Sequence, residues 1–234
     1  MTAPQGAADA AASAPAQRQR GAVPATPSIE PIWLEWFALA GLFAFATWLL
    51  GGRGVWALLL TSDPTGLTLV IIVIFAAATL WCGARARELQ RQRGWLERSR
   101  GGAAAHGWAA DYWAALRAAP RDAGAPLDLL LERTHGPHHT AWWVNGIQLK
   151  LGLLGKVIGF SILAIEIGQI QNFDATQSQD LLRSLTTGLG VALLTTMVGL
   201  VGNILLGLQL TRLDRYADAL VADAQRHGLD VDGR

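Results

Sequence analysis

Charged and polar side chains interrupt two of the most apolar stretches of this sequence. Lys156 lies in the run LGLLGKVIGF, and Glu166 follows before that apolar stretch ends. The next apolar stretch carries the hydroxyl groups of Thr195 and Thr196 and the amide of Asn203. A charged side chain at the centre of a bilayer costs about 2.5–3.5 kcal/mol on insertion scales unless it reaches water or an opposite charge. The chemistry that such residues can perform in a membrane is ion binding or ion passage.

Lys156 and Glu166 are too far apart to pair on one straight helix. Their positions differ by about 15 Å along the helix axis and by about 80° around it. Each side chain therefore needs water or another partner. Two interpretations stay open: both side chains reach the aqueous interfaces at the two ends of the span, or both face a hydrated path between subunits or a partner helix.

The elements that position these groups are predicted to be membrane-spanning helices. The chain is 51% hydrophobic and 16% charged, with a mean hydropathy of +0.28, which is too apolar for an ordinary soluble domain. Residues 32–50, 66–83, 151–170 and 185–210 are each close to the roughly 20 apolar residues that cross a bilayer. We therefore expect an all-α polytopic membrane protein with four transmembrane helices.

Positive charge predicts how the helices are oriented. Arginines are concentrated between the second and third spans, whereas the other two loops hold only Arg53 and Arg183. The positive-inside rule then places residues 84–141 and both termini in the cytoplasm. We expect this segment to be a small helical insert, with short helices in AAHGWAADYWAALRAA and PLDLLLERT, and residues 1–31 to be a disordered tail.

Several function classes are disfavoured. A net charge of +1 argues against nucleic-acid binding, and the single Cys82 can form neither an intrachain disulfide nor a zinc cluster. His135, His138 and His139 are close in sequence, but we expect Pro137 to break the helix there, which makes a polar turn a better interpretation than a metal site. An enzyme is also disfavoured, because the sequence shows neither a pair of nucleophile and base nor a phosphate-binding loop.

The last helix is predicted to continue beyond the membrane, in residues 211–234. Its apolar residues share one face, and they are Leu210, Leu213, Ala217, Leu220, Val221 and Ala224. The acidic residues Asp214, Asp218 and Asp223 are expected elsewhere on the helix. This face fits either a stabilised helical extension or a subunit contact.

The third and fourth spans, within residues 142–210, carry small residues at helical spacing. On the fourth span these are Gly188, Ala192, Thr196, Gly199, Asn203 and Gly207, with Thr195 and Gly202 beside them. On the third span they are Gly152, Gly155, Gly159 and Ser161. Such stripes allow close helix packing or line a polar cavity, and both interpretations stay open.

These two spans carry a family resemblance. The run LGLLGKVIGF, followed after a short loop by GLGVALLTTMVGLVGNI, resembles the last two spans of the MotA/TolQ/ExbB family, the ring-forming subunits of proton-driven membrane motors. The likeness covers residues 149–210, and the four-span topology is closer to the MotA type. It implies a pentamer in the bacterial inner membrane around two helices of a single-span partner of the MotB/TolR/ExbD family, whose intramembrane aspartate carries the proton.

The implied function is an ion-channel subunit that couples the proton motive force, or a sodium gradient, to mechanical work, without a cofactor. The residues expected to line the pore or face the partner are Lys156, Thr196, Thr195, Asn203, Gly155, Gly159, Gly199 and Glu166. Two residues depart from the family pattern: Lys156 replaces a threonine, and Val191 replaces a glutamate common in TolQ and ExbB, whereas Thr196 is retained. A lysine there would repel a passing cation and favour the ionised form of a nearby aspartate. A non-conducting scaffold ring, with Lys156 blocking the ion path, is the alternative.

Overall fold

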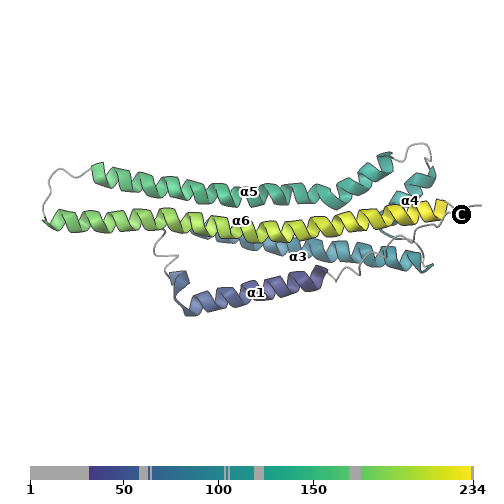
Figure 1. The fold of residues 1–234 in the computed structure, drawn as a ribbon, viewed down its shortest axis with the longest axis horizontal. Helices are drawn as coiled ribbons and strands as arrows, with labels where there is room; N and C mark the ends of the chain where they lie inside the picture. The colour runs from purple at the N-terminus through teal and green to yellow at the C-terminus, as the bar shows by residue number, and fades with distance from the viewer. Residues whose placement is uncertain are drawn as a thin grey trace, which may run out of the picture.

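Every element in the described part of the chain is a helix. The computed structural model describes residues 32–57, 63, 65–102, 104, 106–118, 124–168 and 175–232. The helices are α1 (Ile32–Gly52), α3 (Leu67–Arg100), α4 (Trp108–Ala118), α5 (Gly124–Gly168) and α6 (Ala175–Asp232) (Figure 1). The predicted tail, residues 1–31, lies outside the described residues.

The long helices form an elongated bundle. Helices α5 and α6 run antiparallel, side by side, and make the most extensive contact in the molecule (Figure 1). Helix α3 packs against both of them, and α1 packs mainly against α3. Helix α4 is short and covers one end of the bundle, chiefly against α5.

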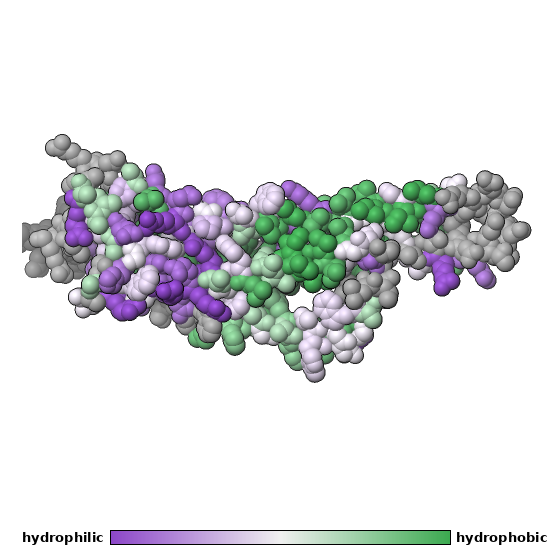
Figure 2. Space-filling view, turned by 180° about the vertical axis from the view of Figure 1, so that it is seen from behind, coloured by the Kyte–Doolittle hydropathy of each residue, from purple (hydrophilic) through white to green (hydrophobic). Residues whose placement is uncertain are grey.

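Three helices are long and apolar enough to cross a membrane: Leu67–Arg100, Gly124–Gly168 and the Gly188–Gly228 part of α6. The first expected span corresponds to α1, in which Trp36–Gly52 is a shorter apolar helix. Hydrophobic residues gather over one part of the surface and hydrophilic residues over another (Figure 2). The all-α class is confirmed for the described residues, and the apolar helices are those of an α-helical membrane protein.

The helices extend well beyond their apolar parts. Helices α3, α5 and α6 contain 34, 45 and 58 residues. At 1.5 Å per residue, even the shortest is about 50 Å long, compared with about 30 Å of hydrocarbon in a bilayer. The predicted insert, residues 84–141, is therefore built mainly from the extensions of α3 and α5. We call this part of the bundle, with α4 and residues 209–228 of α6, the polar end.

The polar turn expected around Pro137 is wrong, because α5 continues through this residue. Proline has no N–H, so the carbonyl of Arg133, four residues earlier, loses its normal helical hydrogen bond. Arg85 of α3 supplies a donor instead: its Nη2 lies 2.6 Å from the Arg133 carbonyl and 2.9 Å from the Thr134 carbonyl. A side chain from another helix thus replaces the missing bond.

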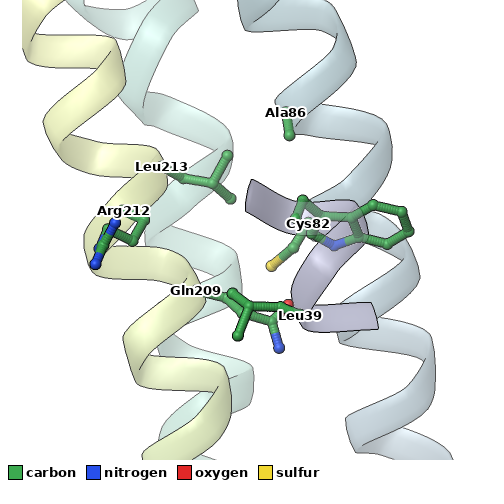
Figure 3. Close-up of a pocket in the computed structure, with 7 residues that line it drawn as sticks. Leu39, Cys82, Ala86, Gln209, Arg212 and Leu213 are labelled. Atoms are coloured by element: carbon green, nitrogen blue, oxygen red, sulfur yellow. The ribbon is translucent and has the colours of Figure 1, made fainter. Parts of the chain in front are cut away.

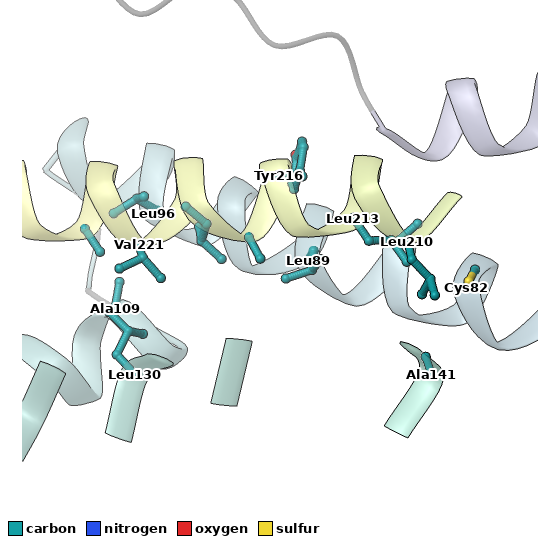
Figure 4. Close-up of a cluster of buried hydrophobic side chains, with 14 of the residues drawn as sticks. Cys82, Leu89, Leu96, Ala109, Leu130, Ala141, Leu210, Leu213, Tyr216 and Val221 are labelled. Carbon is teal, nitrogen blue, oxygen red and sulfur yellow. The ribbon is translucent and has the colours of Figure 1, made fainter. Parts of the chain in front are cut away.

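A hydrophobic cluster holds the polar end together (Figure 4). The predicted apolar face of α6 is confirmed, because all of its residues are buried: Leu210, Leu213, Ala217, Leu220, Val221 and Ala224. They pack with Leu89 and Leu96 of α3, Ala109 of α4 and Leu130 of α5. Burying each leucine contributes about 1.5–3 kcal/mol, so this cluster is a main source of stability outside the apolar half.

The sequence places Asp223 away from the apolar face of α6, but in the structure this residue is buried against α3. It is 4% exposed, and its carboxylate lies 3.3 Å from Arg93 Nη2 and 3.5 Å from Arg100 Nη2. Both arginines belong to α3, in the arginine-rich run of the predicted insert. These ion pairs tie α3 to α6 and set the axial alignment of the two helices.

Helix α1 is anchored by a tryptophan. The ring of Trp36 packs against Gly83, where no larger residue would fit, and its Nε1 donates to the Thr79 carbonyl at 3.2 Å. Beside it, α1, α3 and α6 enclose a cavity of about 20 Å³ lined by Cys82 and Gln209 (Figure 3). This volume is enough for about one water molecule and too small for a substrate.

Candidate functional site

The small residues of α5 and α6 pack directly against each other within one chain. A Cβ added at Gly152 would lie 3.3 Å from the Cα of Gly199, and one added at Gly199 would lie 2.8 Å from the Gln148 carbonyl oxygen. A Cβ added at Gly159 would lie 2.8 Å from the Gly188 carbonyl oxygen. Helix packing therefore accounts for these glycines. We call this contact the α5–α6 seam.

The two threonines of the seam differ in exposure. Thr195 is fully buried, and its hydroxyl donates to the Val191 carbonyl at 2.8 Å. Thr196 is half-buried; its hydroxyl lies 2.7 Å from the Ala192 carbonyl of its own helix and 3.2 Å from the Gly152 carbonyl on α5. Within α5 this same carbonyl accepts the backbone N–H of Lys156. The Thr196 hydroxyl is therefore within about one helical turn of the Lys156 backbone.

Amide side chains continue the polar line toward the polar end. The Nδ2 of Asn203 donates to the Asn145 carbonyl at 2.9 Å, and Gln209 Nε2 lies 3.3 Å from Thr79 Oγ1 on α3. Between these groups and the threonines, Gln148 is completely buried, and neither atom of its amide has a partner among the described residues. Of these amide residues, Asn203 was predicted from the sequence, whereas Asn145, Gln148 and Gln209 were not.

Lys156 points away from the seam. Its side chain is exposed and lies among exposed apolar residues of α5, including Val157 at 61% and Phe160 at 41%. Its Nζ lies 5.9 Å from the centroid of the Phe160 ring. Within the described part of the chain, no carboxylate is within ion-pair distance of this ammonium. The charge is therefore displayed on the outer surface of the apolar half.

Glu166 lies elsewhere on α5, as helical geometry predicted. It is half-buried, and its Oε2 is buried without a hydrogen-bond partner among the described residues. The structure does not bring it together with Lys156. Gly155 is buried against Thr195, whereas Gly159 and Gly199 belong to the seam described above.

The sequence analysis missed a charged network at the polar end. His138 of α5 lies with its Nδ1 2.6 Å from Asp214 Oδ1 on α6, and Arg85 Nε donates to His138 Nε2 at 3.4 Å. Trp142 Nε1 donates to the other carboxylate oxygen of Asp214 at 2.9 Å. Burial lowers the pKa of His138, which outweighs the opposing effect of Asp214. A neutral imidazole with its hydrogen on Nδ1 can donate to the Asp214 carboxylate and accept the hydrogen bond from Arg85 on Nε2.

One turn before His138 on α5, His135 contacts a second carboxylate of α6. His135 Nε2 lies 3.0 Å from Asp218 Oδ1. The histidines therefore use separate carboxylates, and in the described residues no group of three or more His, Cys, Asp or Glu side chains is placed to hold a metal ion. His135 and His138 are about one helical turn apart, and so are Asp214 and Asp218. This spacing could have predicted the two contacts from the sequence, but only if α5 were known to be helical through Pro137.

Comparison with known proteins adds no relative: no family model matches the chain, and no curated protein or solved structure matches it. The likeness to the MotA/TolQ/ExbB family therefore remains a resemblance in two motifs. This resemblance and the geometry of the apolar half are the two observations that bear on function.

Proposed function

We propose that this chain is the ring-forming subunit of an ion-driven complex in the bacterial inner membrane. In this proposal α1, α3, α5 and α6 all cross the bilayer, and the polar end lies in the cytoplasm. Five copies surround a single-span partner that carries an intramembrane aspartate. Ion flow between ring and partner is converted to mechanical work.

The observation that carries the proposal is the exposed ammonium of Lys156 in the apolar half. Leu153 and Val157, its neighbours on α5, are 49% and 61% exposed, as expected of residues that face lipid or another protein. An ammonium in hydrocarbon is costly and is usually paired or placed beside water. A carboxylate on a partner helix would supply what this side chain lacks.

The packing of the seam also favours a path between chains. Glycine backbones of α5 and α6 approach too closely to leave a channel between these two helices. The half-buried Thr196 hydroxyl lies at the edge of this contact, near Lys156, where it could reach a group outside the chain. A path lined by Lys156 and Thr196 would therefore run along the surface of the α5–α6 pair.

The test is the composition of the complex. The protein is purified from its native membrane in mild detergent and its mass is measured by native mass spectrometry. Five copies together with two copies of a single-span protein are expected. A monomer, or a ring without any partner, would contradict the proposed motor.

A non-conducting scaffold ring is the second candidate. The same exposed ammonium favours it, because a permanent ion pair between Lys156 and a partner carboxylate would close the path to cations. The mass of the complex is the same in both cases. Ion flux separates them, as argued in the Discussion.

A further inference from the structure

We infer that the polar end joins each copy of this chain to the next through opposite charges. An acidic groove between α5 and α6 of one copy receives a stripe of arginines on α3 of its neighbour. This inference rests on the proposed ring and adds the two surfaces that would close it. Neither surface takes part in the seam or in the contacts of Lys156.

The acidic groove lies on the side of the α5–α6 pair and has a volume of about 530 Å³. Its lining residues are Asp128, Leu131, Glu132, His135, Gly136, His139 and Asp218. The lining contains three carboxylates and no lysine or arginine. Asp218 is 71% exposed even though it contacts His135, and Leu131 is 38% exposed. This is a surface suited to a cationic side chain with an apolar stem.

The arginine stripe consists of Arg87, Arg91 and Arg98, all of which are exposed. At about 100° per residue these positions fall within about 40° of one another around α3. The centre of the stripe lies opposite Leu89, which is completely buried in the core. The Arg91 side chain is 67% exposed, and its ion pair with Glu88 stays within α3.

The two surfaces lie on opposite sides of the polar end. Helices α3, α5 and α6 all contact one another, so in cross-section they form a triangle. The arginine stripe points outward from the α3 corner, because Leu89 on the other side of that helix faces the core. The groove opens on the edge formed by α5 and α6. A closed ring of identical subunits needs two different, complementary surfaces of this kind.

The height of Arg91 along the bundle follows from the contact between α3 and α6. Arg93 lies beside Asp223, and both helices run from the apolar half to the polar end. Arg91 precedes Arg93 by about 3 Å along the axis, and Val221 precedes Asp223 by the same distance. Arg100 also reaches Asp223, so the two ion pairs place Arg91 between the levels of Asp214 and Val221. The contact of Gln209 with Thr79 favours the level of Val221.

The height of Glu132 follows from the contact between α5 and α6. His135 lies beside Asp218, and α5 runs antiparallel to α6. Glu132 is about 4.5 Å farther from the apolar half than His135, which places it level with Val221 as well. Rotation about an axis parallel to the helices preserves height. In such a ring Arg91 of one copy would meet Glu132 of the next.

This matching favours a second copy over an unrelated basic partner. Charge complementarity alone would admit any cationic segment. In a ring of identical copies, the acidic groove and the arginine stripe must lie at the same height along the bundle, and an unrelated basic partner would not require this. A guanidinium can form two parallel hydrogen bonds to a carboxylate, which also fixes the orientation of the contact.

Charge reversal tests the contact in the full-length protein purified in mild detergent. Arg91→Glu or Glu132→Arg alone is expected to weaken association about fivefold at low salt, because an exposed ion pair is replaced by a repulsion of similar size. Both substitutions in one chain should restore the assembly. Arg117→Glu is the control, because Arg117 is exposed on α4 and its Nε donates to the Trp113 carbonyl within that helix.

Cross-linking identifies the occupant of the groove. Copies with Arg91→Cys are mixed with copies with Glu132→Cys, both in a Cys82→Ala background, and treated with a short bis-maleimide. A dimer containing one copy of each is expected. A ring that survives both single reversals, or a cross-link from Glu132→Cys to a different protein, would overturn the inference. A wild-type chain that is monomeric in the same mass measurement would instead refute the proposed ring.

Discussion

Thr196 is the residue at which loss of a single hydroxyl should affect ion flow. We expect Thr196→Val to lower proton flux about two- to tenfold without altering assembly, because it removes one hydrogen bond of about 0.5–1.5 kcal/mol from the path and keeps the side-chain shape. Flux is measured in proteoliposomes containing the purified complex. Thr211→Val is the control, since the exposed Thr211 hydroxyl donates only to the Gly207 carbonyl of its own helix.

Unchanged flux in Thr196→Val would contradict the proposed path. Lys156→Thr then distinguishes the two candidate functions. In a conducting complex, loss of the ammonium should alter an existing flux. In a scaffold ring, flux should appear only when Lys156 is replaced, because the ion pair that closes the path is gone.

The passage of α5 through Pro137 depends on a residue of another helix. Arg85→Met is expected to lower the free energy of unfolding by about 1–3 kcal/mol, since it leaves the Arg133 carbonyl without a donor. In a Pro137→Ala background that carbonyl regains a helical N–H. The same Arg85→Met substitution should then cost about 1 kcal/mol less. Unfolding in detergent, followed by circular dichroism, measures both differences.

The control for this double-mutant cycle is Arg117→Met. Arg117 is exposed, and its Nε donates to the Trp113 carbonyl of α4 itself. Its replacement should change stability by no more than about 0.5 kcal/mol. Equal costs of Arg85→Met with proline or alanine at position 137 would show that Arg85 does not substitute for the missing N–H.

The close packing of the α5–α6 seam leads to a prediction about the stability of this helix pair. Gly199→Ala should destabilise the α5–α6 pair by about 1–3 kcal/mol, because its Cβ would lie 3.0 Å from the Cα of Gly152. Gly190 is on the same helix but has no neighbour within 4 Å of an added Cβ. Gly190→Ala should therefore be neutral or slightly stabilising. Thermal unfolding of the two variants in the same detergent compares them, and equal destabilisation would contradict the packing argument.

Helical periodicity explains which elements could be predicted from the sequence. It predicted the buried face of α6, the short helix α4 and the separation of Lys156 from Glu166, because each depends on local spacing alone. It did not predict that α5 continues through Pro137, since the compensating donor, Arg85, is 48 residues away from Arg133. The burial of Asp223 likewise depends on Arg93, which is 130 residues away. Contacts between helices carry no periodic signal in one sequence.

At the scale of the whole molecule, charge and direction of the helices favour one orientation. Helix α3 runs toward the polar end, α5 runs away from it, and α6 returns to it (Figure 1). The segment Arg53–Gly54 therefore lies at the other end of α1 and α3 from the arginine-rich run. If these helices span the membrane, the two segments are on opposite sides, with the arginines in the cytoplasm.

Single cysteines in a Cys82→Ala background test this orientation. Arg53→Cys should react with a membrane-impermeant maleimide in intact spheroplasts, whereas Arg117→Cys should react only after the membrane is permeabilised, because both positions are exposed but face different compartments. The reverse pattern would place the polar end outside the cytoplasm and would contradict the proposed orientation. Labelling of both cysteines in intact spheroplasts would mean that α3 does not cross the membrane, which would contradict the proposed ring subunit with four spans.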